Sequence, residues 1–136
     1  MEFDSRIGKK WIRWYAGGED PMHIDDCTFG RIRIDGVEFS KDVILLRDEI
    51  QSPWWRTAGG HRFAPEDLGD VLAASPEVVV LGTGFFGRVK VGQVTFAAFA
   101  DVGSELVVET TAHAVKEFNR LVVEGRDVAA ALHLTC

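Results

Sequence analysis

The sequence is short of the features that mark secreted or membrane-spanning proteins. It has only two cysteines, Cys27 and Cys136, so no disulfide framework is implied and both thiols are expected to stay reduced. Its longest apolar runs, at 78–81 and 128–132, fall far below the roughly 18–20 residues that span a bilayer. The first residues lack the basic and apolar segments of a secretory signal. We therefore expect a cytoplasmic protein with no membrane span.

Positive charge is also scarce. The chain has 15 Lys and Arg against 21 Asp and Glu, a formal net charge of −6, whereas nucleic-acid binding needs clustered cations that neutralise phosphates. We therefore expect no nucleic-acid partner. One local exception is the basic and aromatic stretch 9–15, KKWIRWY, in which Trp11 and Trp14 are candidate contacts for a partner. The alternative is that this stretch lies on the domain's own surface.

Catalytic and metal-binding constellations are missing as well. The sequence shows no nucleophile with a base, no paired acids and no GxSxG elbow, so it favours a non-enzymatic protein with no catalytic residue and no cofactor. His23, Cys27, His133 and Cys136 could form a tetrahedral zinc site only if the strand at His133 broke. Side chains three positions apart on a strand point to opposite faces. We therefore expect no metal site.

The most conspicuous motif that is present is VVVLGTGFFG at 78–87. Its Gly82, Gly84 and Gly87 have the spacing of a dinucleotide-binding turn. In dinucleotide-binding proteins a helix begins directly after this turn, so that its free N–H groups face the pyrophosphate. Here an alternating, β-branched RVKV segment follows, and no helix is expected before about Gln93. The glycines are therefore expected in a longer loop.

Local patterns predict a β-rich first third and then alternating helices and strands. Residues 29–39 predict a β-hairpin, because the alternating FGRIRI is followed by an Asp-Gly turn and VEF. Residues 93–102 fit a strand or a helix, and the strands on either side favour a helix and a βαβ unit. The last strand is continuously apolar, which is typical of a central strand covered on both faces. The later elements are expected as a helix from Pro65, a strand over 78–82, a helix over 93–102, a strand over 105–109, a helix from Thr110 or Thr111 to Gly125, and a strand over 128–134.

Several strings taken together resemble one family, the Mth938-like proteins. They run from about Phe29 to Cys136 and comprise FGRIRIDG, DVILL, SPWWR, the GH before PEDL, VVVLGTG, ETT, FN and AAALHLTC. The resemblance implies a three-layer α/β domain with a mixed central sheet. The predicted N-terminal β-hairpin and the βαβ unit would both belong to this domain. It also implies a family whose molecular activity is largely undefined, so no catalytic residue is transferred.

The resemblance also suggests how the chain is divided. Its length suits one domain on the usual prior of roughly 100–200 residues per domain. We expect a single Mth938-like domain at residues 27–136, preceded by an N-terminal extension over residues 1–26 that the resemblance leaves unexplained.

The leading functional hypothesis is a module that binds a protein partner or self-associates. An assembly role is what the family resemblance suggests, because a mitochondrial complex I assembly factor belongs to that family. Aromatic side chains are the candidate contacts. In an extended chain the adjacent indoles of Trp54 and Trp55 point to opposite sides, so one can face a partner. The candidate partner-binding residues are Trp11, Trp14 and Trp54.

The alternative hypothesis is a small anion or nucleotide binder. Ligands of open α/β sheets dock at the carboxyl ends of the strands, where backbone N–H groups and Arg side chains favour carboxylate or phosphate. Structural roles also explain each of these residues: glycines permit turns, threonines cap helices, and Arg56 can pair with Glu66 or Asp67. The candidate ligand-binding residues are Arg56, His61, Gly82, Thr83, Gly84 and Thr110.

Overall fold

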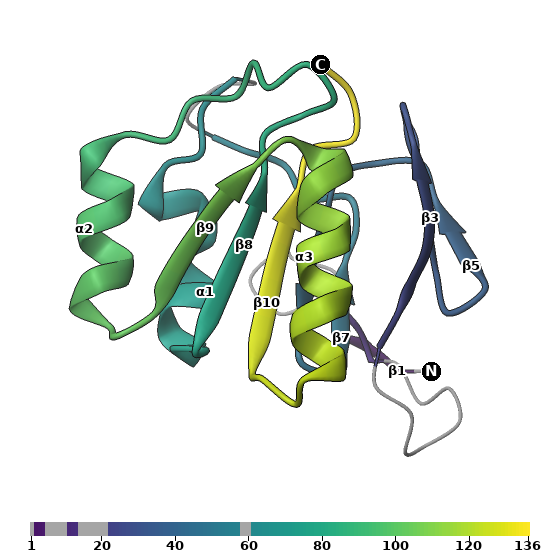
Figure 1. The fold of residues 1–136 in the computed structure, drawn as a ribbon, viewed down its shortest axis with the longest axis horizontal. Helices are drawn as coiled ribbons and strands as arrows, with labels where there is room; N and C mark the ends of the chain where they lie inside the picture. Colours follow the sequence, from purple (N-terminus) through teal and green to yellow (C-terminus); the bar gives the residue numbers. More distant parts are fainter. Residues whose placement is uncertain (1, 5–10, 14–21, 58–60) are drawn as a thin grey trace.

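A mixed central sheet organises the chain in a computed structural model that describes residues 2–4, 11–13, 22–57 and 61–136 (Figure 1). In chain order its elements are β1 (Glu2–Asp4), β2 (Trp11–Arg13), β3 (Ile24–Thr28), β4 (Arg31–Ile34), β5 (Val37–Phe39), β6 (Val43–Leu46), β7 (Glu49–Gln51), a 3-10 helix η2 (Pro65–Leu68), α1 (Gly69–Ala74), β8 (Val78–Gly82), α2 (Gln93–Asp101), β9 (Glu105–Glu109), α3 (Thr111–Val123) and β10 (Val128–Leu132).

The central sheet has the strand order β1-β2-β7-β6-β10-β8-β9. Strand β10 pairs parallel with β8 and antiparallel with β6, so it joins a parallel half to an antiparallel half. All its residues are buried, which confirms the central strand that the apolar run predicts. Strands β8 and β9 are parallel neighbours linked through α2, which confirms the βαβ unit and the helical assignment of residues 93–102.

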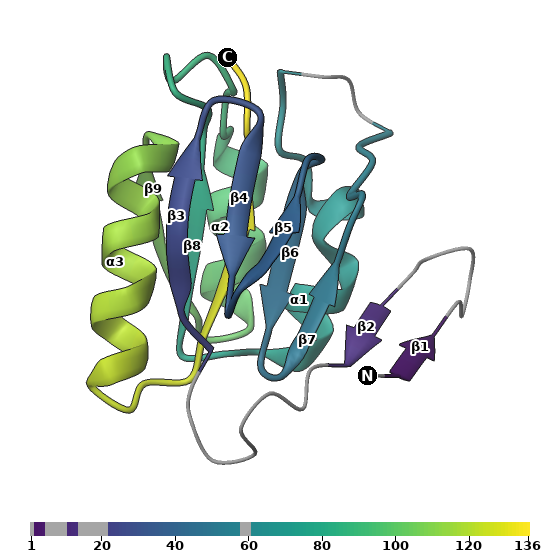
Figure 2. The same ribbon diagram turned by 90° about the vertical axis from the view of Figure 1, so that its right-hand side faces the viewer.

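Two layers cover this sheet on opposite faces (Figures 1 and 2). Helix α3 and the three-stranded sheet β3-β4-β5 lie on one face, and α1 and α2 lie on the other. Because neighbouring side chains on a strand point to opposite faces, Val78 and Val80 enter the first apolar cluster and Val79 and Leu81 enter the second. The expected α/β fold with a mixed central sheet is therefore confirmed.

The predicted β-hairpin forms as β4 and β5, with Asp35 and Gly36 at positive φ in the turn. Phe29 and Gly30 do not belong to its first strand, because they form the turn from β3 into β4. Sequence patterns did not predict β3, since its IDDCT residues are mostly polar and exposed. The Asn119 side chain on α3 holds this strand, accepting from the Ile24 N–H at 2.9 Å and donating to the Ile24 carbonyl at 2.9 Å.

The helices begin close to their expected positions. Pro65 opens η2, which leads into α1, and α2 begins at Gln93. Thr110 precedes α3, but its side chain makes no capping hydrogen bond. In the described part of the chain no helix is both long and apolar enough to cross a membrane.

Part of the predicted N-terminal extension joins the central sheet. Strand β2 pairs antiparallel with β7, with Trp11 opposite Gln51, and β1 pairs with β2. Trp14 and the side chain of Trp11 lie outside the described residues. The strand β3 begins at Ile24, whose side chain is buried in the core, so the packed structure already includes residues ahead of position 27.

Candidate functional site

Strands β8, β9 and β10 all end at the same end of the molecule, the upper end in Figure 1. The start of β6 reaches the same place, because β6 runs antiparallel to β10 and pairs Val43 with Leu132. We call this region the carboxyl edge. It comprises Asp42, residues 54–57, His61, residues 82–88, residues 109–111 and residues 133–136.

A buried charge cluster lies at the centre of the carboxyl edge. Asp42 Oδ2 accepts hydrogen bonds from Arg56 Nη1 at 2.7 Å and from His133 Nδ1 at 2.7 Å. Asp42 Oδ1 accepts the Leu134 N–H at 2.8 Å. The exposed fractions of the side chains are 17% for Asp42, 6% for Arg56 and 10% for His133. Three donors therefore converge on one carboxylate that is largely withdrawn from water.

The protonation of Asp42 follows from these contacts. Burial alone would raise the pKa of Asp42, because it penalises the charged form. The hydrogen bonds from His133, Arg56 and the Leu134 N–H favour the charged form, and together they hold the pKa below its ordinary 3.8. Asp42 is therefore a carboxylate at neutral pH, and it fixes the His133 ring through Nδ1.

The other ring nitrogen of His133 faces a hydroxyl. The Nε2 atom lies 3.2 Å from Thr135 Oγ1, within hydrogen-bonding distance. Asp42, His133 and Thr135 thus form a carboxylate–imidazole–hydroxyl series. Contacts at both ring nitrogens fix the orientation of the imidazole.

Two aromatic rings hold Arg56 in place. Its guanidinium carbon lies 5.0 Å from the Trp54 ring centroid and 5.3 Å from that of Phe63. Trp54 is only 2% exposed and its indole N–H donates to the Asp67 carbonyl at 3.0 Å. The choice of Trp54 as the indole that faces a partner is therefore wrong. Trp54 is buried in the core, and the neighbouring Trp55 is the exposed indole, at 71%.

Residues 133–136 bind the glycine loop. The Phe85 N–H donates to the Thr135 carbonyl at 2.8 Å and the Arg88 N–H to the Cys136 carbonyl at 3.2 Å. The Gly84 N–H donates to Thr111 Oγ1 at 2.9 Å. Gly84 has a φ of +103°, and a Cβ atom there would collide with the backbone of Cys136. These N–H groups of the glycine loop therefore already donate hydrogen bonds within the chain.

The structure brings only some of the predicted ligand residues together. Arg56 and His61 both reach the carboxyl edge: Arg56 Nη2 lies 3.2 Å from His133 Nδ1, and the His61 ring meets the His133 ring edge-on at 6.4 Å. The hydroxyls of Thr83 and Thr110 point elsewhere, to the Glu109 carbonyl at 3.1 Å and to His113 Nδ1 at 3.1 Å.

Asp42 was missed as a functional candidate, and His133 and Cys136 were considered for a zinc site that the sequence did not favour. Asp42 directly precedes a buried strand, and His133 and Cys136 follow one. Once β6 is known to pair antiparallel with β10, the residue before one strand must meet the residue after the other. The pairing of β6 with β10 would have predicted this contact, and no local sequence pattern indicates that pairing.

A thiol and an imidazole also meet at this edge. His61 Nε2 lies 3.5 Å from Cys136 Sγ. Both cysteines are free and partly buried. Among the described residues no three His, Cys, Asp or Glu side chains are placed to hold a metal ion.

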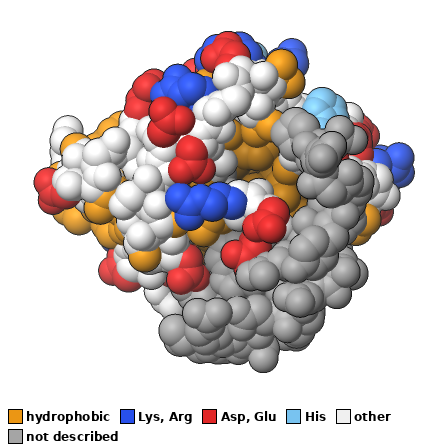
Figure 3. Space-filling model, turned by 90° about the horizontal axis from the view of Figure 1, so that it is seen from below, with side chains coloured by type: hydrophobic (Ala, Val, Ile, Leu, Met, Phe, Trp, Pro, Cys, Tyr) orange, Lys and Arg blue, Asp and Glu red, His pale blue; other side chains and the backbone are white. Residues whose placement is uncertain are grey.

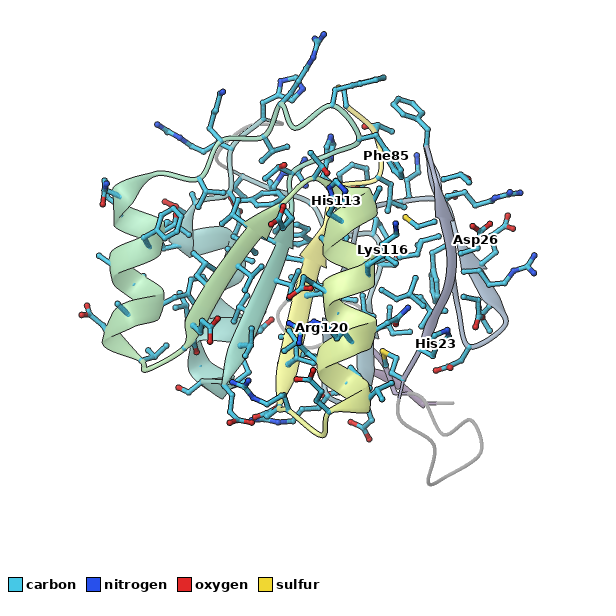
Figure 4. The ribbon with its side chains drawn as sticks, viewed as in Figure 1. His23, Asp26, Phe85, His113, Lys116 and Arg120 are labelled. Carbon is cyan, nitrogen blue, oxygen red and sulfur yellow. The ribbon has the colours of Figure 1, made fainter. Side chains whose placement is uncertain are left out.

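An aromatic patch lies next to residues 134–135, because the Gly30 N–H donates to the Leu134 carbonyl at 2.7 Å and the Phe85 N–H donates to the Thr135 carbonyl at 2.8 Å. We define the aromatic patch as Phe29, Phe85 and Phe86, which come from the β3–β4 turn and the glycine loop. The Phe29 ring centroid lies 6.1 Å from that of Phe85 and 6.0 Å from that of Phe86. Phe29 is 57% exposed and Phe86 is 69% exposed. Phe85 lies above the start of α3, beside the tip of β3 (Figure 4).

A pocket of about 270 Å³ lies between η2 and the start of α2. It contains none of the ligand residues predicted from the sequence. Its lining residues are Arg62, Phe63, Ala64, Pro65, Glu66, Gly92, Gln93, Val94 and Thr95.

At the end of the molecule opposite the carboxyl edge, acidic and basic side chains are scattered over the surface (Figure 3).

Solved structures share this fold. The structure of MT938 is 28% identical, with a TM-score of 0.71, and the match covers 85% of this chain and 99% of that one. An outer membrane protein from Bartonella henselae is 25% identical, with a TM-score of 0.72 over 83% and 94% of the two chains. The fold also matches that of a Mth938-like domain from Bordetella pertussis, at 23% identity and a TM-score of 0.63 over 82% and 85%.

These likenesses define a Mth938-like α/β domain. Residues 24–133 match the model of one family, DUF498, described as a protein of unknown function (DUF498/DUF598), and the chain belongs to that family. The resemblance that the sequence strings carried is therefore confirmed.

Proposed function

We propose that this chain is a protein-interaction module that docks through the aromatic patch. The observation that carries the proposal is the exposure of Phe29 and Phe86 on two different segments that meet through Phe85. Clustered exposed aromatics are typical of interaction sites, because they bury a large apolar area for little loss of side-chain entropy. Trp55 adds a further exposed ring at the carboxyl edge.

The anion-binding alternative has less support. A small anion at the Gly82-Thr83-Gly84 loop would need free backbone donors, and the N–H groups of Thr83, Gly84 and Phe85 already donate within the chain. An anion would have to displace these bonds. The aromatic patch needs no such rearrangement. Trp11 and Trp14 remain candidates for further contacts with a partner. The proposal also includes an assembly role and a cytoplasmic location.

The test compares a patch variant with a matched variant elsewhere. Phe29→Ser with Phe86→Ser should weaken self-association or partner binding by about 30-fold, the loss of about 2 kcal/mol typical of an interface hot spot. Phe96→Ser is the control, since Phe96 is an exposed phenylalanine on α2, 42% exposed. Sedimentation velocity over a concentration series reports self-association, and capture from host extract reports a partner. A monomer that captures nothing, or equal binding by both variants, would refute the proposal.

A further inference from the structure

The thiol of Cys136 has a base beside it. His61 Nε2 lies 3.5 Å from Cys136 Sγ, within hydrogen-bonding reach for a sulfur acceptor or donor. His61 is exposed and Cys136 is only partly buried, so we expect a small reagent to reach the sulfur from solvent. A nucleophile with a positioned imidazole is the usual arrangement of a reactive cysteine.

Further contacts hold His61 in this position. Its carbonyl accepts the Lys90 N–H at 2.9 Å. Its ring lies perpendicular to the His133 ring, with the centroids 6.4 Å apart. The His133 ring is itself fixed by Asp42 at 2.7 Å. The imidazole that faces the sulfur is therefore oriented by backbone pairing on one side and by a buried, hydrogen-bonded ring on the other.

The second cysteine provides a contrast within the same chain. Burial, reinforced by the charge of Asp26, raises the pKa of the Cys27 thiol to about 11. Cys27 lies on β3 and packs against the apolar core. At neutral pH it is a protonated, partly buried thiol, and it serves as an internal reference for the reactivity of Cys136.

The surroundings of Cys136 favour one class of substrate. A carbonyl substrate develops a negative oxygen that needs free N–H donors nearby. Two donors of the glycine loop that contact this segment, the N–H groups of Phe85 and Arg88, already donate to the carbonyls of Thr135 and Cys136. A disulfide needs no such donors, because the charge that develops leaves on sulfur.

We propose that Cys136 is a reactive thiol, assisted by His61, that exchanges with small-molecule disulfides. Cys136 Sγ gives its proton to His61 Nε2 and attacks one sulfur of a disulfide RSSR. The S–S bond of RSSR breaks, a Cys136–S–S–R bond forms, and the other half leaves as a thiolate that takes the proton from His61 as RSH. The protein thiol is oxidised and one RS group is reduced, so electrons and protons balance. This step is independent of docking at the aromatic patch.

The experiment treats the reduced full chain with glutathione disulfide and follows each cysteine by intact mass and peptide mapping. Cys136 is expected to gain a glutathionyl group at least about tenfold faster than Cys27, since the thiolate is the attacking species. His61→Gln should slow modification of Cys136 by at least about tenfold, whereas His113→Gln, a change to an exposed histidine on α3, should leave the rate unchanged.

Two measurements keep the proposal falsifiable. In denaturant Cys136 and Cys27 should react at similar rates, because the advantage of Cys136 depends on the fold. Circular dichroism checks that the His61→Gln protein is folded, and the ratio of Cys136 to Cys27 in the unchanged protein is a test that needs no variant. Equal rates at the two cysteines in the folded chain, or a folded His61→Gln protein that reacts as fast as the unchanged protein, would overturn the proposal.

Discussion

The two ends of the central sheet hold their charges in different ways. At the carboxyl edge, Arg56 and Asp42 meet at 2.7 Å with side chains 6% and 17% exposed. At the opposite end, Arg47 and Asp127 meet at 3.2 Å with side chains 51% and 38% exposed. Water can replace a lost partner at the second end but not at the first. From this difference in burial we expect the same kind of ion pair to contribute much more to stability at the carboxyl edge than at the opposite end.

Removing the shared carboxylate should have the largest effect. Asp42→Ala leaves the buried charge of Arg56 without this partner and frees the His133 ring, and we expect a loss of about 3–5 kcal/mol in the free energy of unfolding. Asp127→Ala is the matched control at the opposite end, with an expected loss below about 1 kcal/mol. Urea denaturation measures both. Similar losses for the two variants would contradict the contrast.

Glycine substitutions should also cost more stability at the carboxyl edge than at the opposite end. The difference should be smaller than for the ion pairs. Gly103, which follows α2, has a φ of +80° and open space around its missing Cβ, so Gly103→Ala should cost about 1–2 kcal/mol of backbone strain. Gly84→Ala adds a collision with Cys136, for a further 1–3 kcal/mol or so. Thermal unfolding measures the difference, and amide exchange at Phe85 and Arg88 should rise only in Gly84→Ala. Equal losses of stability in the two variants would show that residues 133–136 move aside without cost when a Cβ atom is added at position 84.

Acid should weaken the carboxyl edge through Asp42. Its pKa in the folded protein is lower than the ordinary 3.8, so its stabilising contribution is fully present above the unfolded pKa of about 3.9 and is lost as the pH falls below it. The free energy of unfolding should therefore fall as the pH drops below about 4. Asp42→Asn, which cannot titrate, should show a shallower fall in the same pH series. Identical slopes would mean that other carboxylates carry the acid response.

The smallest effect is expected at an exposed ring of the same edge. Trp55→Ala should change the free energy of unfolding by no more than about 0.5 kcal/mol, because the side chain is 71% exposed. Trp54→Ala, one position away, should cost about 3–5 kcal/mol, because its ring is buried against Phe63 and Arg56. Chemical denaturation of the pair shows how sharply the edge divides into core and surface. A large loss for Trp55→Ala would contradict that division.

Local patterns predicted the elements of this fold better than the site. The β4–β5 hairpin, the start of α2 and the buried strand β10 follow from alternation, turn residues and apolar runs. The contact between Asp42 and His133 joins positions 91 residues apart. It depends on which strands become neighbours, and neither residue carries that information. Alternation likewise showed that Trp54 and Trp55 face opposite ways but could not show which one faces the core.

The place of β10 in the sheet has a consequence for how the chain folds. The β6–β7 hairpin and the β8–α2–β9 unit are each contiguous in sequence, and both depend on β10 for their connection within the sheet. Each can begin to form by itself, but a continuous sheet must wait for a segment that comes late in the sequence. Closing such distant contacts is slow because the entropy of the intervening chain is lost first. We expect the arrival of β10 to be the step that turns two loosely ordered pieces into one cooperative unit.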